Sequence, residues 1–77
     1  MKHSEVETGQ YYMARVSGRI VPVLVVDMIE YKRINRTRKE FECINVATGS
    51  TVYRSARQLR DKANKERVEA RFGKVTP

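Results

Sequence analysis

The stretch RIVPVLVVDMIEY occupies residues 19–31 and decides the fold. Val and Ile dominate it, and β-branched side chains favour the pleated surface of a sheet. Apolar side chains fall on both of its faces, so the strand is expected to be central or sharply bent, with each half facing the core. Pro22 lacks a backbone N–H and belongs at an edge or a bulge. We therefore expect one long, bent strand with an irregular start.

Shorter strands are expected on either side of this stretch. Residues 11–16 alternate with a period of two, and Ser17-Gly18 follows as a two-residue turn. Residues 40–46 alternate again, and residues 51–54 form a short strand after a Thr-Gly turn. Inside the long strand, Asp27 either marks a bulge or is a buried acid paired with an arginine.

The periodicity changes at Ser55. Ser55 and Gln58 have the spacing of a capping box, which predicts a helical turn over residues 55–59. Good helix formers continue without proline, and Gly73 is placed to end a helix. The composition therefore predicts a helix through residues 60–72, although its apolar stripe is sparse.

The chain has 77 residues, enough for one domain. We expect a flexible N-terminus over residues 1–8, a compact sheet over residues 9–60, and a basic C-terminal helix or tail over residues 61–77. A small sheet must close or be covered to avoid exposed edges. The expected fold is therefore mainly β, a small, strongly bent barrel of about four or five strands with a helical turn and a C-terminal helix.

Three motifs and the Val-rich strand carry a resemblance: GQYYMARVSG at residues 9–18, NVATG at residues 45–49 and RSARQLR at residues 54–60. Together they resemble a small SH3-like or Tudor-like barrel over residues 9–60. Several such domains occur in phage-type and bacterial proteins and in translation or transcription factors. The chain departs from SH3 domains that bind Pro-rich peptides, because their aromatic groove usually includes Trp and this chain has none. The peptide-binding residues are therefore not carried over.

The charge is concentrated in the middle of the chain. The net charge is +7, and residues 31–60 alone contribute eight bases and two acids, a net of +6. A basic excess among strands and loops, in place of a disordered tail, indicates a folded surface that meets phosphates or acidic groups.

Two groups of basic residues are candidate phosphate-binding sites. The first is a basic cluster that comprises Lys32, Arg33, Arg36, Arg38 and Lys39. The alternative interpretation of this cluster is a solvated, charged hairpin with no ligand. The second group comprises Arg54, Arg57 and Arg60 and lies in and around the helical turn. The alternative interpretation is that these long side chains pack their stems against the sheet and keep their charged ends in water. Arginine can grip a phosphate with two donors at once. Tyr11, Tyr31 and Tyr53 are candidates for stacking on bases, or else they form the core and its rim.

Other classes of function have little support in the sequence. One cysteine, Cys43, and one histidine make neither a disulfide nor a metal site, and no catalytic constellation is visible. We expect a cytoplasmic protein that is not an enzyme, with no cofactor, no small-molecule substrate and no membrane span. The leading hypothesis is a small module that binds DNA or RNA mainly through the phosphate backbone. The alternative is a protein-interaction adaptor, a phage-type or accessory regulator, that binds an acidic surface of a partner protein.

Overall fold

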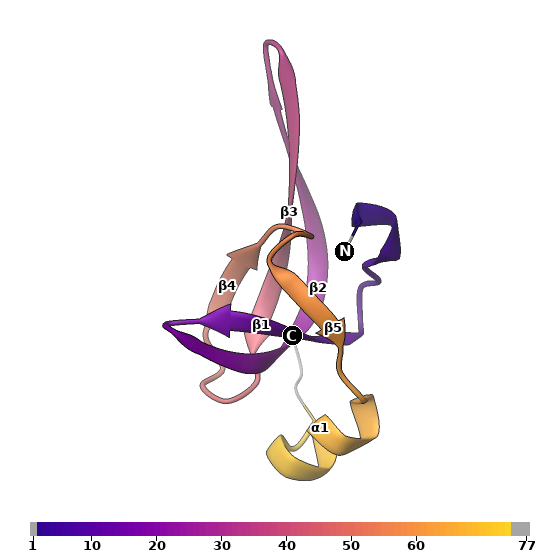
Figure 1. The fold of residues 1–77 in the computed structure, drawn as a ribbon, viewed down its shortest axis with the longest axis vertical. Helices are drawn as coiled ribbons and strands as arrows, with labels where there is room; N and C mark the ends of the chain where they lie inside the picture. Colours follow the sequence, from indigo (N-terminus) through magenta and orange to yellow (C-terminus); the bar gives the residue numbers. More distant parts are fainter. Residues whose placement is uncertain (1, 75–77) are drawn as a thin grey trace.

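The computed structural model describes residues 2–74 and shows five antiparallel strands in one open sheet, followed by a C-terminal helix (Figure 1). The elements are β1 (Tyr11–Val16), β2 (Arg19–Arg33), β3 (Arg36–Asn45), β4 (Thr51–Arg54), β5 (Leu59–Lys62) and α1 (Lys65–Phe72), with a short 3-10 turn at His3–Glu5. The strand order is β4-β3-β2-β1-β5, which places β4 and β5 at the two edges. The predicted mainly-β class and C-terminal helix are confirmed.

The long strand β2 contains the expected irregularity. Its pairing with β3 shifts between Val25 and Asp27, which leaves Val26 as an extra, bulged residue. A bulge bends its strand and increases the local twist. Asp27 is exposed beside the bulge, and its carboxylate accepts a hydrogen bond of 2.8 Å from the backbone N–H of Met28. The interpretation of Asp27 as a bulge marker is confirmed, and that of a buried, paired acid is wrong.

Pro22 lies where the pairing between β2 and β3 stops. The first pair of that ladder is Val23 with Asn45, and the Pro22 carbonyl accepts a hydrogen bond of 3.2 Å from the N–H of Val46. The backbone groups of Val25 bond on the β1 side, so those of Pro22, three residues earlier, point towards β3. The missing N–H therefore falls at the end of the ladder, where its absence costs little.

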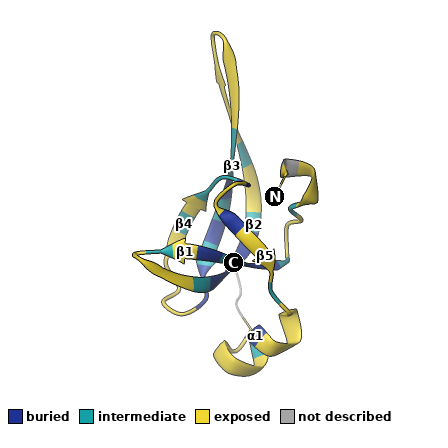
Figure 2. Ribbon diagram, viewed as in Figure 1, coloured by how far each residue is buried: buried dark blue, intermediate teal, exposed yellow. Residues whose placement is uncertain are grey.

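The buried residues, dark blue in Figure 2, form two apolar clusters. The inner cluster joins strands β1, β2, β3 and β5 to the turn between β4 and β5; it comprises Tyr12, Ala14, Val23, Val25, Phe41, Cys43, Ala56 and Leu59. The outer cluster lies beneath α1 and comprises Tyr11, Leu24, Val46 and Val68. The neighbours Tyr11 and Tyr12 go to opposite clusters because successive side chains in a strand point to opposite faces.

The helix predicted over residues 60–72 is wrong in its first part. Residues 59–62 form β5, and the helix begins only at Lys65. Leu59 pairs with Ala14 of β1 and is 2 % exposed, so it completes the inner cluster. A backbone ladder and a buried leucine outweigh the helix propensities of these residues, which differ by only a few tenths of a kcal/mol.

The helix α1 has well-formed ends. The Asn64 side chain accepts a hydrogen bond of 3.1 Å from the N–H of Arg67, and Gly73 ends the helix with φ 85°. The role predicted for Gly73 is thus confirmed. The Tyr11 hydroxyl donates to Glu69 at 3.2 Å, which ties the helix to the outer face of β1. Residues 75–77, included in the predicted tail, lie outside the described residues.

The turn predicted from the capping-box spacing over residues 55–59 is present at residues 56–58, while Leu59 already belongs to β5. The N–H groups of Gln58 and Leu59 both donate to the Ser55 carbonyl, at 3.0 and 3.2 Å. The Gln58 side chain returns to accept from the Ser55 N–H at 3.0 Å. This turn links β4 to β5 and carries Arg57, while Arg54 ends β4 and Arg60 lies in β5.

Candidate functional site

The predicted basic cluster lies at the end of a projecting two-stranded ribbon. We call residues 28–40 the arm: within it β2 and β3 stay paired from Ile29–Glu40 to Arg33–Arg36, and Ile34-Asn35 makes the turn. Figure 1 shows the arm standing away from the rest of the sheet, and the chain measures 44 × 22 × 22 Å. Residues 30–38 are all exposed (Figure 2).

The arm separates the predicted cluster into two faces. Directly paired residues of an antiparallel ribbon share a face, and the faces alternate along each strand. Arg33 pairs with Arg36, and Tyr31 pairs with Arg38, so these four side chains share one face, which we call the arginine face. Lys32 and Lys39 lie on the opposite face, where their partners are Thr37 and Glu30.

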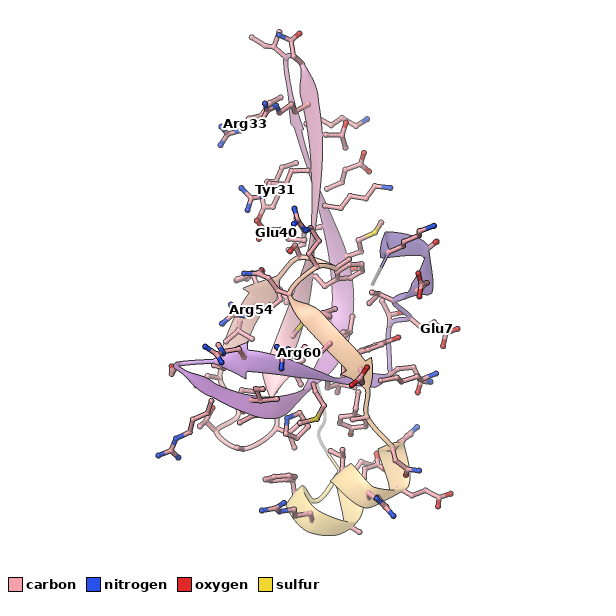
Figure 3. All side chains as sticks on the ribbon, viewed as in Figure 1. Glu7, Tyr31, Arg33, Glu40, Arg54 and Arg60 are labelled. Atoms are coloured by element: carbon pink, nitrogen blue, oxygen red, sulfur yellow. The ribbon has the colours of Figure 1, made fainter. Side chains whose placement is uncertain are left out.

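The arginine face carries charge that the described residues neutralise only in part. Arg33 and Arg36 are like charges in directly opposite positions, an arrangement that destabilises a ribbon. Within residues 2–74, the ion pair found on the arm joins Arg38 Nε to Glu40 at 3.2 Å, close to the sheet. Figure 3 shows Arg33 towards the tip, with Tyr31 and then Glu40 nearer the body of the protein.

Acidic residues follow the arginine face towards the sheet. Glu40 comes first, and Glu42 and Asp27 then form a directly opposite pair. The Tyr53 hydroxyl donates to Glu42 at 3.4 Å, and the nearby carboxylate raises the pKa of Tyr53. The arm is therefore basic at its tip and acidic at its foot.

The three candidate stacking residues differ in their exposure. Tyr31 and Tyr53 are 44 % and 45 % exposed, and each presents part of its ring to solvent. Tyr11 is 1 % exposed within the outer cluster, so its ring has no surface on which a base could stack. Its burial corresponds to the core role that the sequence also allowed.

The structure brings the second group of arginines together with a fourth. A shallow hollow of about 440 Å³ is lined by Arg54, Arg57 and Arg60 together with Arg15 and Gln58. Sequence reasoning missed Arg15, because the alternation of β1 indicates only that this side chain faces solvent. Its position beside the others depends on the pairing of β1 with β5, which the sequence did not predict.

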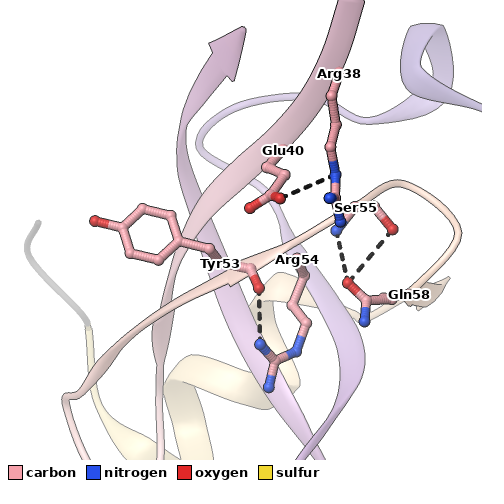
Figure 4. Close-up of polar contacts among 6 residues, drawn as sticks. All are labelled: Arg38, Glu40, Tyr53, Arg54, Ser55 and Gln58. Atoms are coloured by element: carbon pink, nitrogen blue, oxygen red, sulfur yellow. Dashed lines mark hydrogen bonds and ion pairs between the residues drawn. The ribbon is translucent and has the colours of Figure 1, made fainter. Parts of the chain in front are cut away.

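Three hydrogen bonds hold Arg54 and Gln58 in place, and Figure 4 draws those from Arg54 to Tyr53 and from Ser55 to Gln58. The Arg54 guanidinium donates to the Tyr53 carbonyl at 2.7 Å and to the Arg15 carbonyl at 3.3 Å. The Gln58 oxygen accepts from the Ser55 N–H at 3.0 Å, which leaves the amide nitrogen as the end that can donate to a ligand. No carboxylate is among the described residues that line the hollow.

Other chemistry finds little support in the described residues. Among the side chains that the structure describes, which do not include that of His3, no cluster of three or more His, Cys, Asp or Glu is placed to hold a metal ion. Cys43 is fully buried, and its burial raises the pKa of the thiol to about 11, so the thiolate needed for nucleophilic attack is disfavoured. No helix in the described chain has the length and apolar character needed to cross a membrane.

Comparison with known proteins gives no match to the chain, whether with protein-family models, curated proteins or solved structures.

Proposed function

We propose that the protein binds nucleic acid through the arginine face of its arm. The observation that carries this proposal is the alignment of Arg33, Arg36 and Arg38 on one side of a projecting ribbon. Arg33 and Arg36 repel each other in the free protein, and a phosphate placed between them would turn that repulsion into attraction. The exposed cationic groups therefore destabilise the free arm, and a bound anionic ligand would remove this destabilisation.

The geometry of the arm suits a polyanion better than a single small anion. A two-stranded ribbon has a width that enters the DNA major groove, and it can also lie along a single strand. Contacts from arginine to successive phosphates release counterions and supply affinity with little sequence readout. The exposed rings of Tyr31 and Tyr53 could stack on unpaired bases.

The test is a salt titration of binding to short labelled DNA and RNA, single-stranded and duplex. A double variant, Arg33→Gln with Arg36→Gln, is expected to weaken binding to every sequence and to reduce the log–log salt slope by roughly one for each phosphate that the protein no longer neutralises. Lys32→Gln with Lys39→Gln is the matched control, because it removes the same charge from the other face of the arm.

Two results would contradict the proposal. Equal weakening of binding by the two double variants would mean that only net charge matters. Binding that disappears for all nucleic acids at about 150 mM salt would reduce the interaction to generic charge attraction.

We further propose that the open sheet is an SH3-like module that curls towards a closed barrel. Arg54, at the end of edge strand β4, donates to the Arg15 carbonyl on β1 and so bridges the two sides of the curl. Ala56, in the turn between the edge strands, and Leu59, at the start of β5, pack in the same cluster as Phe41 of β3. Slow amide exchange at β4 and β5, matching that of β2, would support closure.

A second function, the protein-interaction adaptor, is favoured by one observation. Ile34 at the tip of the arm is 101 % exposed and offers an apolar side chain that a partner protein could bury. The surrounding arginines would suit an acidic protein surface. Ile34→Ser discriminates the two functions, because phosphate binding would not change while docking on a protein would weaken.

A further inference from the structure

The hollow of four arginines differs from the arm in a way that points to a different ligand group. Its cationic side chains come from β1, β4, the turn and β5, and they converge on one place. On the arm, by contrast, the arginines are spread along a ribbon. Figure 3 shows Arg54 and Arg60 at the foot of the arm, well away from Arg33.

The number of donors in the hollow exceeds what one backbone phosphate uses. A phosphodiester carries one charge and two free oxygens. A terminal phosphate carries three strong acceptor oxygens and a charge near −2 at neutral pH, as a phosphorylated side chain does. An arginine has five N–H donors, and Arg54 spends two on backbone carbonyls, so three remain while the side chain is held in place.

The charge of the hollow has no internal neutralisation. Its described lining contains four guanidinium groups and one amide, and no carboxylate. Within residues 2–74, the ion pairs found are Arg38–Glu40 and Lys62–Glu7, and neither involves the hollow. Four converging like charges destabilise the folded state, and a bound dianion would relieve this repulsion.

We propose that this hollow binds the terminal phosphate of a nucleic-acid strand. Arg57 and Arg60, both exposed, close on the phosphate from the turn and β5, while Arg54 and the Gln58 amide provide the fixed donors. This inference rests on the proposed function, because it assigns a strand end to a protein whose arm holds the strand. The same chemistry also fits free inorganic phosphate, so the test separates the two sources.

The experiment compares otherwise identical oligonucleotides that end in hydroxyl groups, in a 5′-phosphate or in a 3′-phosphate. For the unaltered protein we expect one phosphorylated end to bind roughly tenfold more tightly, as one additional charge-assisted hydrogen bond would produce. The double variant Arg57→Gln with Arg60→Gln should lose this preference and bind the phosphorylated and the hydroxyl-ended strands equally. Arg67→Gln on α1 is the single-charge control and should keep the preference.

A second measurement uses inorganic phosphate alone. Thermal unfolding in phosphate and in chloride of matched ionic strength should show a higher Tm in phosphate, and the difference should vanish in the Arg57→Gln, Arg60→Gln variant. This measurement does not depend on the arm, and Arg33→Gln with Arg36→Gln should leave it unchanged.

The outcomes separate the two proposals. Equal binding of all strand ends would overturn the terminal-phosphate site and leave the proposed function standing. If inorganic phosphate stabilises the protein but the protein shows no preference among strand ends, the proposed ligand is wrong. The hollow would then bind free phosphate and not the end of a strand. Loss of oligonucleotide binding altogether, with phosphate stabilisation retained, would be the failure of the proposed function.

Discussion

Arg33 and Arg36 stand directly opposite each other across β2 and β3, at the last pair before the Ile34-Asn35 turn. Hairpin tips more often carry residues that favour a tight turn, and like charges in opposite positions weaken the ribbon. The tip of the arm is therefore arranged for something other than its own stability. An interaction partner that supplies negative charge accounts for the arrangement.

The first prediction concerns the arm alone. Arg36→Glu replaces repulsion by attraction across the pair, so the arm should become more stable by about 0.2–1 kcal/mol. Amide exchange at residues 30–38 should slow at low salt, while exchange in the inner cluster should not change. At the same time, binding to nucleic acid should fall. A faster exchanging arm in this variant would show that Arg36 has a structural role that its pairing does not explain.

The second prediction concerns Leu59, the residue that the helix prediction misplaced. Leu59 is 2 % exposed in the inner cluster, and Leu59→Ala should lower the free energy of unfolding by about 2–5 kcal/mol. Ile34→Ala removes a similar apolar side chain from the exposed tip and should change the free energy of unfolding by less than about 0.5 kcal/mol. Urea denaturation measures both. Similar destabilisation in the two variants would contradict the position of β5 in the sheet.

The third prediction concerns the start of α1. Asn64→Ala removes the acceptor for the Arg67 N–H and should cost about 1 kcal/mol of helix stability. The circular-dichroism signal of the helix should fall and amide exchange in α1 should accelerate. Asn64→Asp keeps an acceptor oxygen at the same place and should restore both measurements. If the two substitutions have the same effect, the cap does not hold the helix.

The fourth prediction concerns pH. Burial raises the pKa of the Cys43 thiol from 9.0 to about 11. Between these values the unfolded chain loses the proton while the folded chain keeps it, so stability is full below pH 9 and falls as pH rises towards 11. The decrease is roughly 2–3 kcal/mol. Unfolding of the unaltered protein and of Cys43→Ala at a series of pH values isolates this contribution. Parallel pH profiles would contradict it.

Much of the sheet could be predicted from the sequence because its signals are local. The two-sided Val-rich stretch, the alternation of residues 11–16 and the Ser17-Gly18 turn each depend on neighbouring residues, and each corresponds to an observed strand or turn. The basic hairpin was predictable for the same reason. The separation of its charges into two faces follows once the register of Arg33 with Arg36 is known.

The remaining features depend on contacts between distant residues. Leu59 and Ala63 are four apart, a helical spacing, yet they pack in different clusters because β1 offers Leu59 a free edge. Arg15 joins Arg57 and Arg60 only through that same pairing of β1 with β5. Helix propensity carries no information about an edge supplied by a strand that lies far earlier in the chain.

None of the arm residues, 28–40, belongs to either apolar cluster. Folding and recognition are thus encoded in separate parts of one short chain. Substitutions along the ribbon could alter the choice of target while the free energy of the core stays nearly constant. The domain therefore offers a ready scaffold for laboratory selection, in which the tip is randomised and the sheet beneath it is left as it is.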